Sequence, residues 1–86
     1  MTDEFKIEIV NPDQLFYSNG KILEAVIPAF EGEIGILKDH ISIISFLKPG
    51  IIKLKINNSD KKTFYVEDGI IEFKDNLLSI LTSNIV

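Results

Sequence analysis

Residues 64–81 have the sequence FYVEDGIIEFKDNLLSIL, and this stretch decides the fold class. Asp68-Gly69 is typical of a two-residue β-turn, and Asp75-Asn76 in the same role predicts a second hairpin. The two turns place six apolar residues on one face of three strands: Phe64, Val66, Ile71, Phe73, Leu78 and Ile80. Because the two turns are assigned independently and agree on one face, the stretch predicts three strands over a common core.

Two apolar residues fall on the opposite face of these strands. In the predicted register Ile70 and Leu81 face each other there, among polar and charged neighbours. Val10 likewise lies opposite the apolar face of its own strand. A single exposed apolar residue indicates nothing about function, whereas several on one surface indicate a protein interface. The sequence leaves open whether these three side chains meet.

Short strands are also predicted along the rest of the chain. Apolar and charged residues alternate over residues 5–10, 21–27 and 51–56, a short strand is expected over 15–17, and β-branching favours a buried strand over 41–47. Asn19-Gly20 predicts a hairpin, Glu31–Gly35 a tight connection, and 57–62 a polar loop. About eight short strands with frequent turns indicate an all-β sandwich or barrel.

Composition limits the function classes. The 86 residues are enough for one small domain, spanning 1–86. The net charge is −4, with nine lysines and no arginine, which argues against a nucleic-acid partner. Cysteine is absent and histidine occurs once, so we expect no metal site and no cofactor. No apolar run approaches the ~20 residues of a membrane-spanning helix, so we expect no direct insertion into a membrane.

Two features suggest chemistry, and each has a plainer interpretation. Glu31 and Glu33 are a close carboxylate pair, and His40 is a candidate general base or pH switch. Nothing supplies a nucleophile or a third metal ligand, so no catalytic residue is assigned. The alternatives are a solvated loop and a histidine whose hydrogen bonds fix a loop.

Lys61 follows Asp60 in the polar loop and resembles the modified-lysine turn of lipoyl carrier domains. Carrier domains consist of two similar halves, and the sequence contains no such repeat. A lipoyl-type carrier with a modified Lys61 remains the alternative function.

Three motifs resemble the N-terminal domain of the F-type ATP synthase epsilon subunit: EGEIGIL at 31–37 followed by His40, LKPG at 47–50, and VEDGIIEF at 66–73. The resemblance covers the whole chain. Departures from the family pattern are Lys38 in place of a proline, Ile41-Ser42 in place of Ala-Pro, and Asp68 in place of a glycine. The family usually continues into a C-terminal helical hairpin, whereas the present sequence ends at Val86.

The resemblance implies a small flattened β-sandwich of about eight to ten short, mostly antiparallel strands. It implies a non-catalytic rotor subunit in the central stalk of a proton-translocating synthase, coupling the gamma subunit to the membrane c-ring. Such a protein would be peripheral, on the cytoplasmic face of the bacterial inner membrane. Because the family's ATP-binding motif lies in the helical domain, no ATP binding is expected.

By position in the family pattern, seven residues are candidate contacts. The c-ring set is Glu31, Gly32, Glu33, Asp39 and His40, and the gamma set is Asn11 and Ser45.

Overall fold

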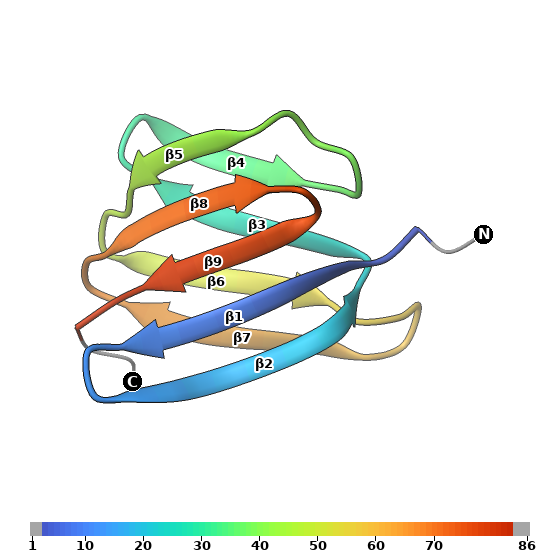
Figure 1. Ribbon diagram of the computed structural model, residues 1–86, viewed down its shortest axis with the longest axis horizontal. Helices are drawn as coiled ribbons and strands as arrows, with labels where there is room; N and C mark the ends of the chain where they lie inside the picture. The colour runs from blue at the N-terminus through green and yellow to red at the C-terminus, as the bar shows by residue number, and fades with distance from the viewer. Residues whose placement is uncertain (1–2, 84–86) are drawn as a thin grey trace.

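Nine β-strands in two sheets packed face to face make up the computed structural model, which describes residues 3–83 (Figure 1). The five-stranded sheet has the order β2 (Gln14–Ile22), β1 (Phe5–Asn11), β9 (Leu77–Leu81), β8 (Ile70–Lys74) and β5 (Ile43–Phe46). The four-stranded sheet has the order β4 (Gly32–Ile36), β3 (Glu24–Ala29), β6 (Gly50–Lys55) and β7 (Lys61–Val66). Of the neighbouring strands, β1 and β9 are parallel and all others antiparallel. The predicted all-β sandwich is confirmed.

The core lies between the two sheets and is filled mainly by isoleucine. In residues 3–83, the twelve largest of the almost completely buried side chains are Phe5, Phe73, Ile7, Ile9, Ile22, Ile27, Ile36, Ile52, Leu54, Ile71, Leu78 and Ile80. Each such side chain contributes about 1.5–3 kcal/mol relative to exposure. In residues 3–83 no helix is long and apolar enough to cross a membrane.

The predicted β8–β9 hairpin is confirmed. Asp75 and Asn76 both have positive φ, 51° and 58°, as a type I′ turn requires. Phe73 pairs with Leu78 and Ile71 with Ile80, which is the predicted register.

The predicted hairpin at Asp68-Gly69 is wrong. Strand β7 pairs with β6, whereas β8 pairs with β5 and β9, so the chain crosses between the sheets at this point. Val66 and Ile71 are both buried because they enter the core from opposite sheets. A hairpin and a crossover give the same alternation, so the pattern could not separate them.

The predicted hairpin at Asn19-Gly20 is also wrong, because β2 runs through both residues with a bulge opposite Lys6. The β1–β2 hairpin closes earlier, at Pro12-Asp13. There the side-chain Oδ1 of Asn11 accepts hydrogen bonds from two backbone N–H groups at 2.8 and 2.9 Å. The hairpin is therefore closed by an Asx turn at Asn11, and not by the Asn-Gly pair. The strands expected over 15–17 and 21–27 are therefore β2 and β3.

Three further features of the structure differ from the prediction: the start of one strand, the burial of another, and the end of a loop. Residues 32–35 belong to β4, and the turn before it is Phe30-Glu31. Strand β5 forms at the edge of its sheet, and Ile44 and Phe46 on its outer face are 71% and 66% exposed instead of buried. The polar loop ends at Asp60, and Lys61 is the first residue of β7.

Candidate interaction surfaces

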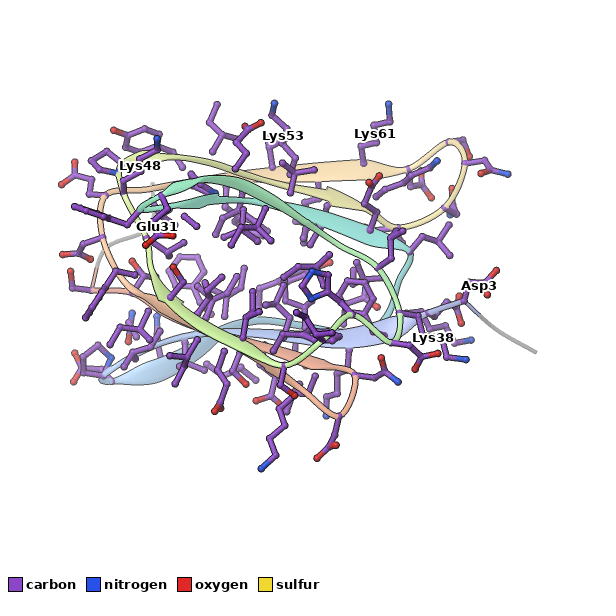
Figure 2. The ribbon with its side chains drawn as sticks, turned by 90° about the horizontal axis from the view of Figure 1, so that it is seen from above. Asp3, Glu31, Lys38, Lys48, Lys53 and Lys61 are labelled. Carbon is purple, nitrogen blue, oxygen red and sulfur yellow. The ribbon has the colours of Figure 1, made fainter. Side chains whose placement is uncertain are left out.

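The candidate acid–base residues do not form a site. Glu31 lies in the turn before β4, and Lys38, two residues before His40, lies at the other end of the molecule (Figure 2). Glu31 and Glu33 have no ion pair or side-chain hydrogen bond within residues 3–83. Nor do residues 3–83 contain a group of three side chains that could hold a metal ion. The acid–base arrangement considered from the sequence is therefore not formed by Glu31, Glu33 and His40.

His40 fixes the loop between β4 and β5. Its backbone N–H donates to the carbonyl O of Leu37 (3.1 Å), and its Nδ1–H donates to the carbonyl O of Ile41 (2.8 Å). Its ring packs perpendicular to that of Phe73, with centroids 6.0 Å apart. This geometry matches the second interpretation of His40, a residue whose hydrogen bonds fix a loop.

Asp39 and Asn76 join the same loop to the β8–β9 turn. The Asp39 N–H donates to Oδ1 of Asn76 (2.7 Å), and Nδ2 of Asn76 donates to Oδ1 of Asp39 (2.9 Å). Both residues have positive φ, 65° and 58°, a conformation that Asp and Asn tolerate better than most residues. The loop is thus held in place by side chains 37 positions apart in the sequence.

Lys61 does not stand at the tip of a turn. It is the first residue of β7 and pairs with Lys55 in the sheet. The tip is closed by Asn57, whose Oδ1 accepts the N–H groups of Ser59 (2.9 Å) and Asp60 (2.8 Å). A lipoyl-type carrier with Lys61 on an exposed turn is therefore not supported.

An apolar row crosses the outer face of the five-stranded sheet. We use this name for five residues that are neighbours in register, one from each strand: Leu15, Val10, Leu81, Ile70 and Phe46. Val10 is half-buried, and the other four are between 42% and 66% exposed. In Figure 1 the row follows the left end of the front sheet, where β1, β5 and β9 end and β2 and β8 begin. Val10, Ile70 and Leu81, whose clustering the sequence left open, therefore do lie together.

The apolar row continues beyond these five side chains. Ile44 lies on β5, two residues before Phe46, and lines a shallow hollow together with Val10, Ile70 and Leu81. A second hollow lies over Phe46, Ile70 and Leu81. A continuous exposed apolar surface of this kind is typical of a protein interface.

The two predicted gamma-contact residues are sequence neighbours of the apolar row, but the side chain of Ser45 lies on the inner face of β5, where Ser45 pairs with the buried Ile71. Asn11 follows Val10 at the β1–β2 turn, and Ser45 precedes Phe46 on β5. Ser45 is half-buried and its hydroxyl donates to the carbonyl O of Phe46 (3.3 Å). Sequence reasoning missed Leu15 and Phe46, because the row becomes visible only when the order of the strands is known.

The five predicted ring-contact residues lie along one long side of the sandwich, which we call the β4 side. It consists of edge strand β4 with the Phe30-Glu31 turn at one end and the 37–42 loop at the other (Figure 1). Glu31, Gly32 and Glu33 are at the first end, and Asp39 and His40 at the second. Phe30 in the turn and Leu37 and Ile41 in the loop expose 70%, 56% and 76% of their surface. The backbone N–H of Phe30 donates to the carbonyl O of Phe46 (2.8 Å), which joins the β4 side to the apolar row.

A family model described as the β-sandwich domain of the ATP synthase delta/epsilon chain matches residues 4–86. The chain belongs to this family. The ATP synthase epsilon chain of Pelagibacter ubique is 66% identical over 85 residues, which are 99% of the present chain and 65% of that relative. The epsilon chain of Dichelobacter nodosus is 38% identical over 94% of the present chain and 56% of that relative. The epsilon chain of Chlorobium limicola is 31% identical over 94% of the present chain and 91% of that relative. The chain thus spans 65% and 56% of the first two relatives.

Two solved structures show the same sandwich fold at low sequence identity. A chain in the Euglena gracilis mitochondrial ATP synthase, solved with OSCP, F1 and c-ring, superposes with a TM-score of 0.88 at 21% identity, covering 100% of this chain and 54% of its own. A chain in the Tetrahymena thermophila mitochondrial ATP synthase central stalk and c-ring superposes with a TM-score of 0.80 at 13% identity. The match covers 99% of this chain and 67% of that chain. The resemblance carried by residues 31–37 and 47–50 is therefore confirmed at the level of family and fold.

Proposed function

We propose that this chain is a non-catalytic subunit of the rotor of a proton-translocating F-type ATP synthase, placed between the gamma subunit and the c-ring. The observation that carries the proposal is an exposed apolar row on a sandwich of the epsilon family. The curated relatives named above are epsilon chains, and the two structural neighbours come from complexes whose names include the c-ring. Such a complex would place the chain on the cytoplasmic face of the bacterial inner membrane.

The gamma subunit, in this proposal, packs on the apolar row. Phe46 at 66% exposure and Leu15 at 58% leave most of their apolar surface in water when the chain is alone. Burying one such side chain contributes about 1.5–3 kcal/mol, so a few suffice for a stable contact. Asn11, beside Val10 at the β1–β2 turn, lies at the margin of the row, where interfaces are normally polar. Ser45 is the second proposed polar contact, on the edge strand β5.

The c-ring, in the same proposal, contacts the β4 side. Glu31 and Glu33 have no partner within residues 3–83, so their carboxylates are free to meet polar groups of another subunit. Asp39 and His40 would contact the ring from the other end of β4, on a loop held rigid by Asn76. A stiff loop suits a rotor, because torque passes through a rigid contact without being absorbed.

Binding of the purified chain to purified gamma subunit tests the main contact. Phe46→Asp and Ile70→Asp place a carboxylate in the row, and we expect each to weaken binding at least tenfold, which corresponds to ~1.4 kcal/mol. Tyr65→Asp is the matched control, because Tyr65 is 40% exposed on the outer face of the other sheet. Its affinity should stay within about twofold of wild type.

Failure of the wild-type chain to bind gamma at micromolar concentration would overturn the proposal. Equal weakening by all three substitutions would show that the row is not the contact. Melting temperatures of the variants separate lost binding from lost folding, since all three positions are exposed.

A further inference from the structure

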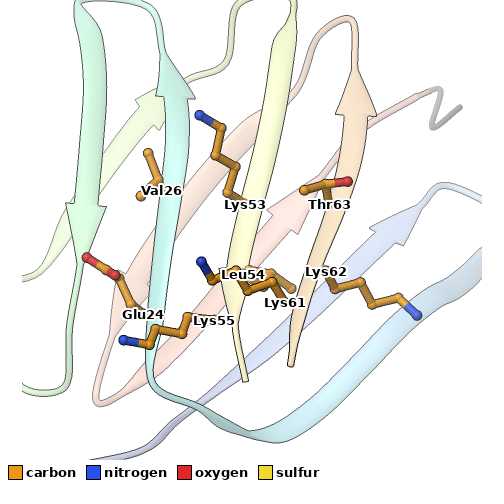
Figure 3. A pocket seen from close by; sticks show the side chains of 8 residues that line it. All are labelled: Glu24, Val26, Lys53, Leu54, Lys55, Lys61, Lys62 and Thr63. Carbon is orange, nitrogen blue, oxygen red and sulfur yellow. The ribbon is translucent and has the colours of Figure 1, made fainter. Parts of the chain in front are cut away.

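A shallow hollow of about 300 Å³ lies on the outer face of the four-stranded sheet, across β3, β6 and β7 (Figure 3). Its lining consists of Glu24, Val26, Lys53, Leu54, Lys55, Lys61, Lys62 and Thr63. These residues carry four lysines against one glutamate, a net charge of +3. The whole chain carries −4, so the residues outside the hollow sum to −7. The lining of the hollow is thus net basic, whereas the rest of the chain is net acidic.

Three of the lysines project from the same side of the sheet. In register, Lys55 lies between Glu24 and Lys61, and Lys53 lies between Val26 and Thr63. Figure 2 shows Lys53 and Lys61 pointing away from the body of the sandwich. Lys62 differs, since its ammonium lies 5.2 Å from the centroid of the Tyr17 ring at the sandwich edge.

No intramolecular ion pair neutralises this surface. Within residues 3–83, Lys53, Lys55 and Lys61 have no carboxylate partner, although Glu24 lines the same hollow. Lys55 and Lys61 are moreover directly opposite each other in the ladder, and like charges in that position are destabilising. A local arrangement that opposes folding indicates that the surface has another use.

We propose that this basic hollow docks an acidic segment of a neighbouring protein subunit. Lysines at alternate positions of β6 are spaced about 7 Å apart, a spacing that carboxylates on an extended or helical segment can match. The floor at Val26 is apolar, and beside it Gly35 leaves open space, so backbone or aliphatic groups can approach between the charges.

The same chemistry fits an anionic bilayer or a free phosphate less well. Stable attachment to anionic lipid needs an inserted apolar anchor besides a basic patch, and the hollow offers only its lysines and the Val26 floor. The chain has no arginine, so the bidentate fork that favours phosphate is missing. The surface lies on the opposite sheet from the apolar row, so this inference is independent of the proposed gamma contact.

Amide chemical shifts of the ¹⁵N-labelled 86-residue chain test the docking. The probe is an acetylated, amidated octaglutamate peptide, with octaglutamine as its uncharged match. We expect octaglutamate to shift the amides of Val26, Lys53 and Thr63, with affinity falling at least tenfold between 20 and 300 mM salt, and octaglutamine to shift none.

Charge-matched variants show whether the hollow is responsible. Lys53→Gln/Lys55→Gln/Lys61→Gln should weaken octaglutamate binding at least tenfold, whereas Lys6→Gln/Lys21→Gln/Lys74→Gln, on the other sheet, should leave it within twofold. The first variant should keep or raise its melting temperature, because it removes repulsion. Equal weakening by both variants, or no binding by the wild type, overturns the proposal. Binding of vesicles with 30% phosphatidylglycerol or of 10 mM inorganic phosphate without binding of the peptide also overturns it.

In the assembled synthase, a zero-length carbodiimide should join Lys53, Lys55 or Lys61 to a carboxylate of another subunit, with Lys6 and Lys21 as internal controls. Cross-links confined to the control lysines would contradict the docking. Gamma binding is measured separately, so either proposal can fail alone.

Discussion

Asp39 and Asn76 are the residues on which the position of His40 depends. Two hydrogen bonds at 2.7 and 2.9 Å join the 37–42 loop to the β8–β9 turn, and His40 follows directly. The sequence made Asp39 and His40 candidates by family position, and predicted Asn76 only as a turn residue. The bond between them could not be foreseen, because it joins segments whose neighbourhood depends on the order of the strands.

Asn76→Gly tests this link without backbone strain, because glycine accepts the positive φ of 58° at that position. The variant loses both side-chain hydrogen bonds, and we expect a cost of about 1–2 kcal/mol in the free energy of unfolding by urea. Asp39→Gly and the double variant complete a cycle in which the intrinsic cost of each glycine cancels. Because Asp39→Gly keeps the backbone N–H, a coupling near zero would show that the bond from Nδ2 of Asn76 to Oδ1 of Asp39 contributes nothing.

Asp68 shows how a departure from the family pattern can be accommodated. Its side chain accepts hydrogen bonds from the Ser83 hydroxyl at 2.8 and 2.9 Å, and its carbonyl O accepts one from the Thr82 hydroxyl at 2.7 Å. The carboxylate therefore holds the chain where it leaves β9.

At the scale of elements, the two predicted turns in residues 64–81 had opposite outcomes for a physical reason. Asp75 and Asn76 adopt the paired positive φ angles of a type I′ turn, so the local signal and the ladder agree. Gly69 has a φ of 144° in a segment that crosses between sheets. A glycine is needed there because Leu81 and Leu47 approach its Cα closely, and not because the chain forms a hairpin. Local sequence predicted the inner faces of all three strands correctly, but it could not predict their partners.

Gly69→Ala tests the close approach. A Cβ there would clash with the carbonyl O of Leu81 and lie 3.0 Å from a methyl of Leu47, and the φ of 144° also disfavours alanine. We expect a loss of more than about 3 kcal/mol in the free energy of unfolding. Gly20→Ala is the control, since its Cβ would meet nothing within 4 Å, and its effect should stay below about 1 kcal/mol. Equal urea midpoints for both variants would contradict the role assigned to Gly69.

At the scale of the whole molecule, the two outer faces differ in chemistry. One carries the apolar row and the other the basic hollow, with a stiff isoleucine core between them. The sequence predicted Ile70 and Leu81 as an exposed pair, which is confirmed, but only the parallel pairing of β1 with β9 brings Val10 beside Leu81. Surfaces assembled from several strands are invisible to local patterns, whereas the buried face of each strand is not.

The orientation of this body on the ring is the last testable consequence. If the β4 side faces the ring along its length, positions at both ends of β4 contact it. Single cysteines at Glu31 and Asp39, each carrying a benzophenone photo-cross-linker, should both join to the c subunit in the assembled synthase. Asn58, in the turn between β6 and β7 away from β4, is the control and should not. Cross-linking from Glu31 alone would contradict the side-on contact and indicate that the sandwich stands on the end that carries the Phe30-Glu31 turn. Cross-linking from Asn58 alone would place the opposite side against the ring and remove the carboxylates of Glu31 and Glu33 from the contact.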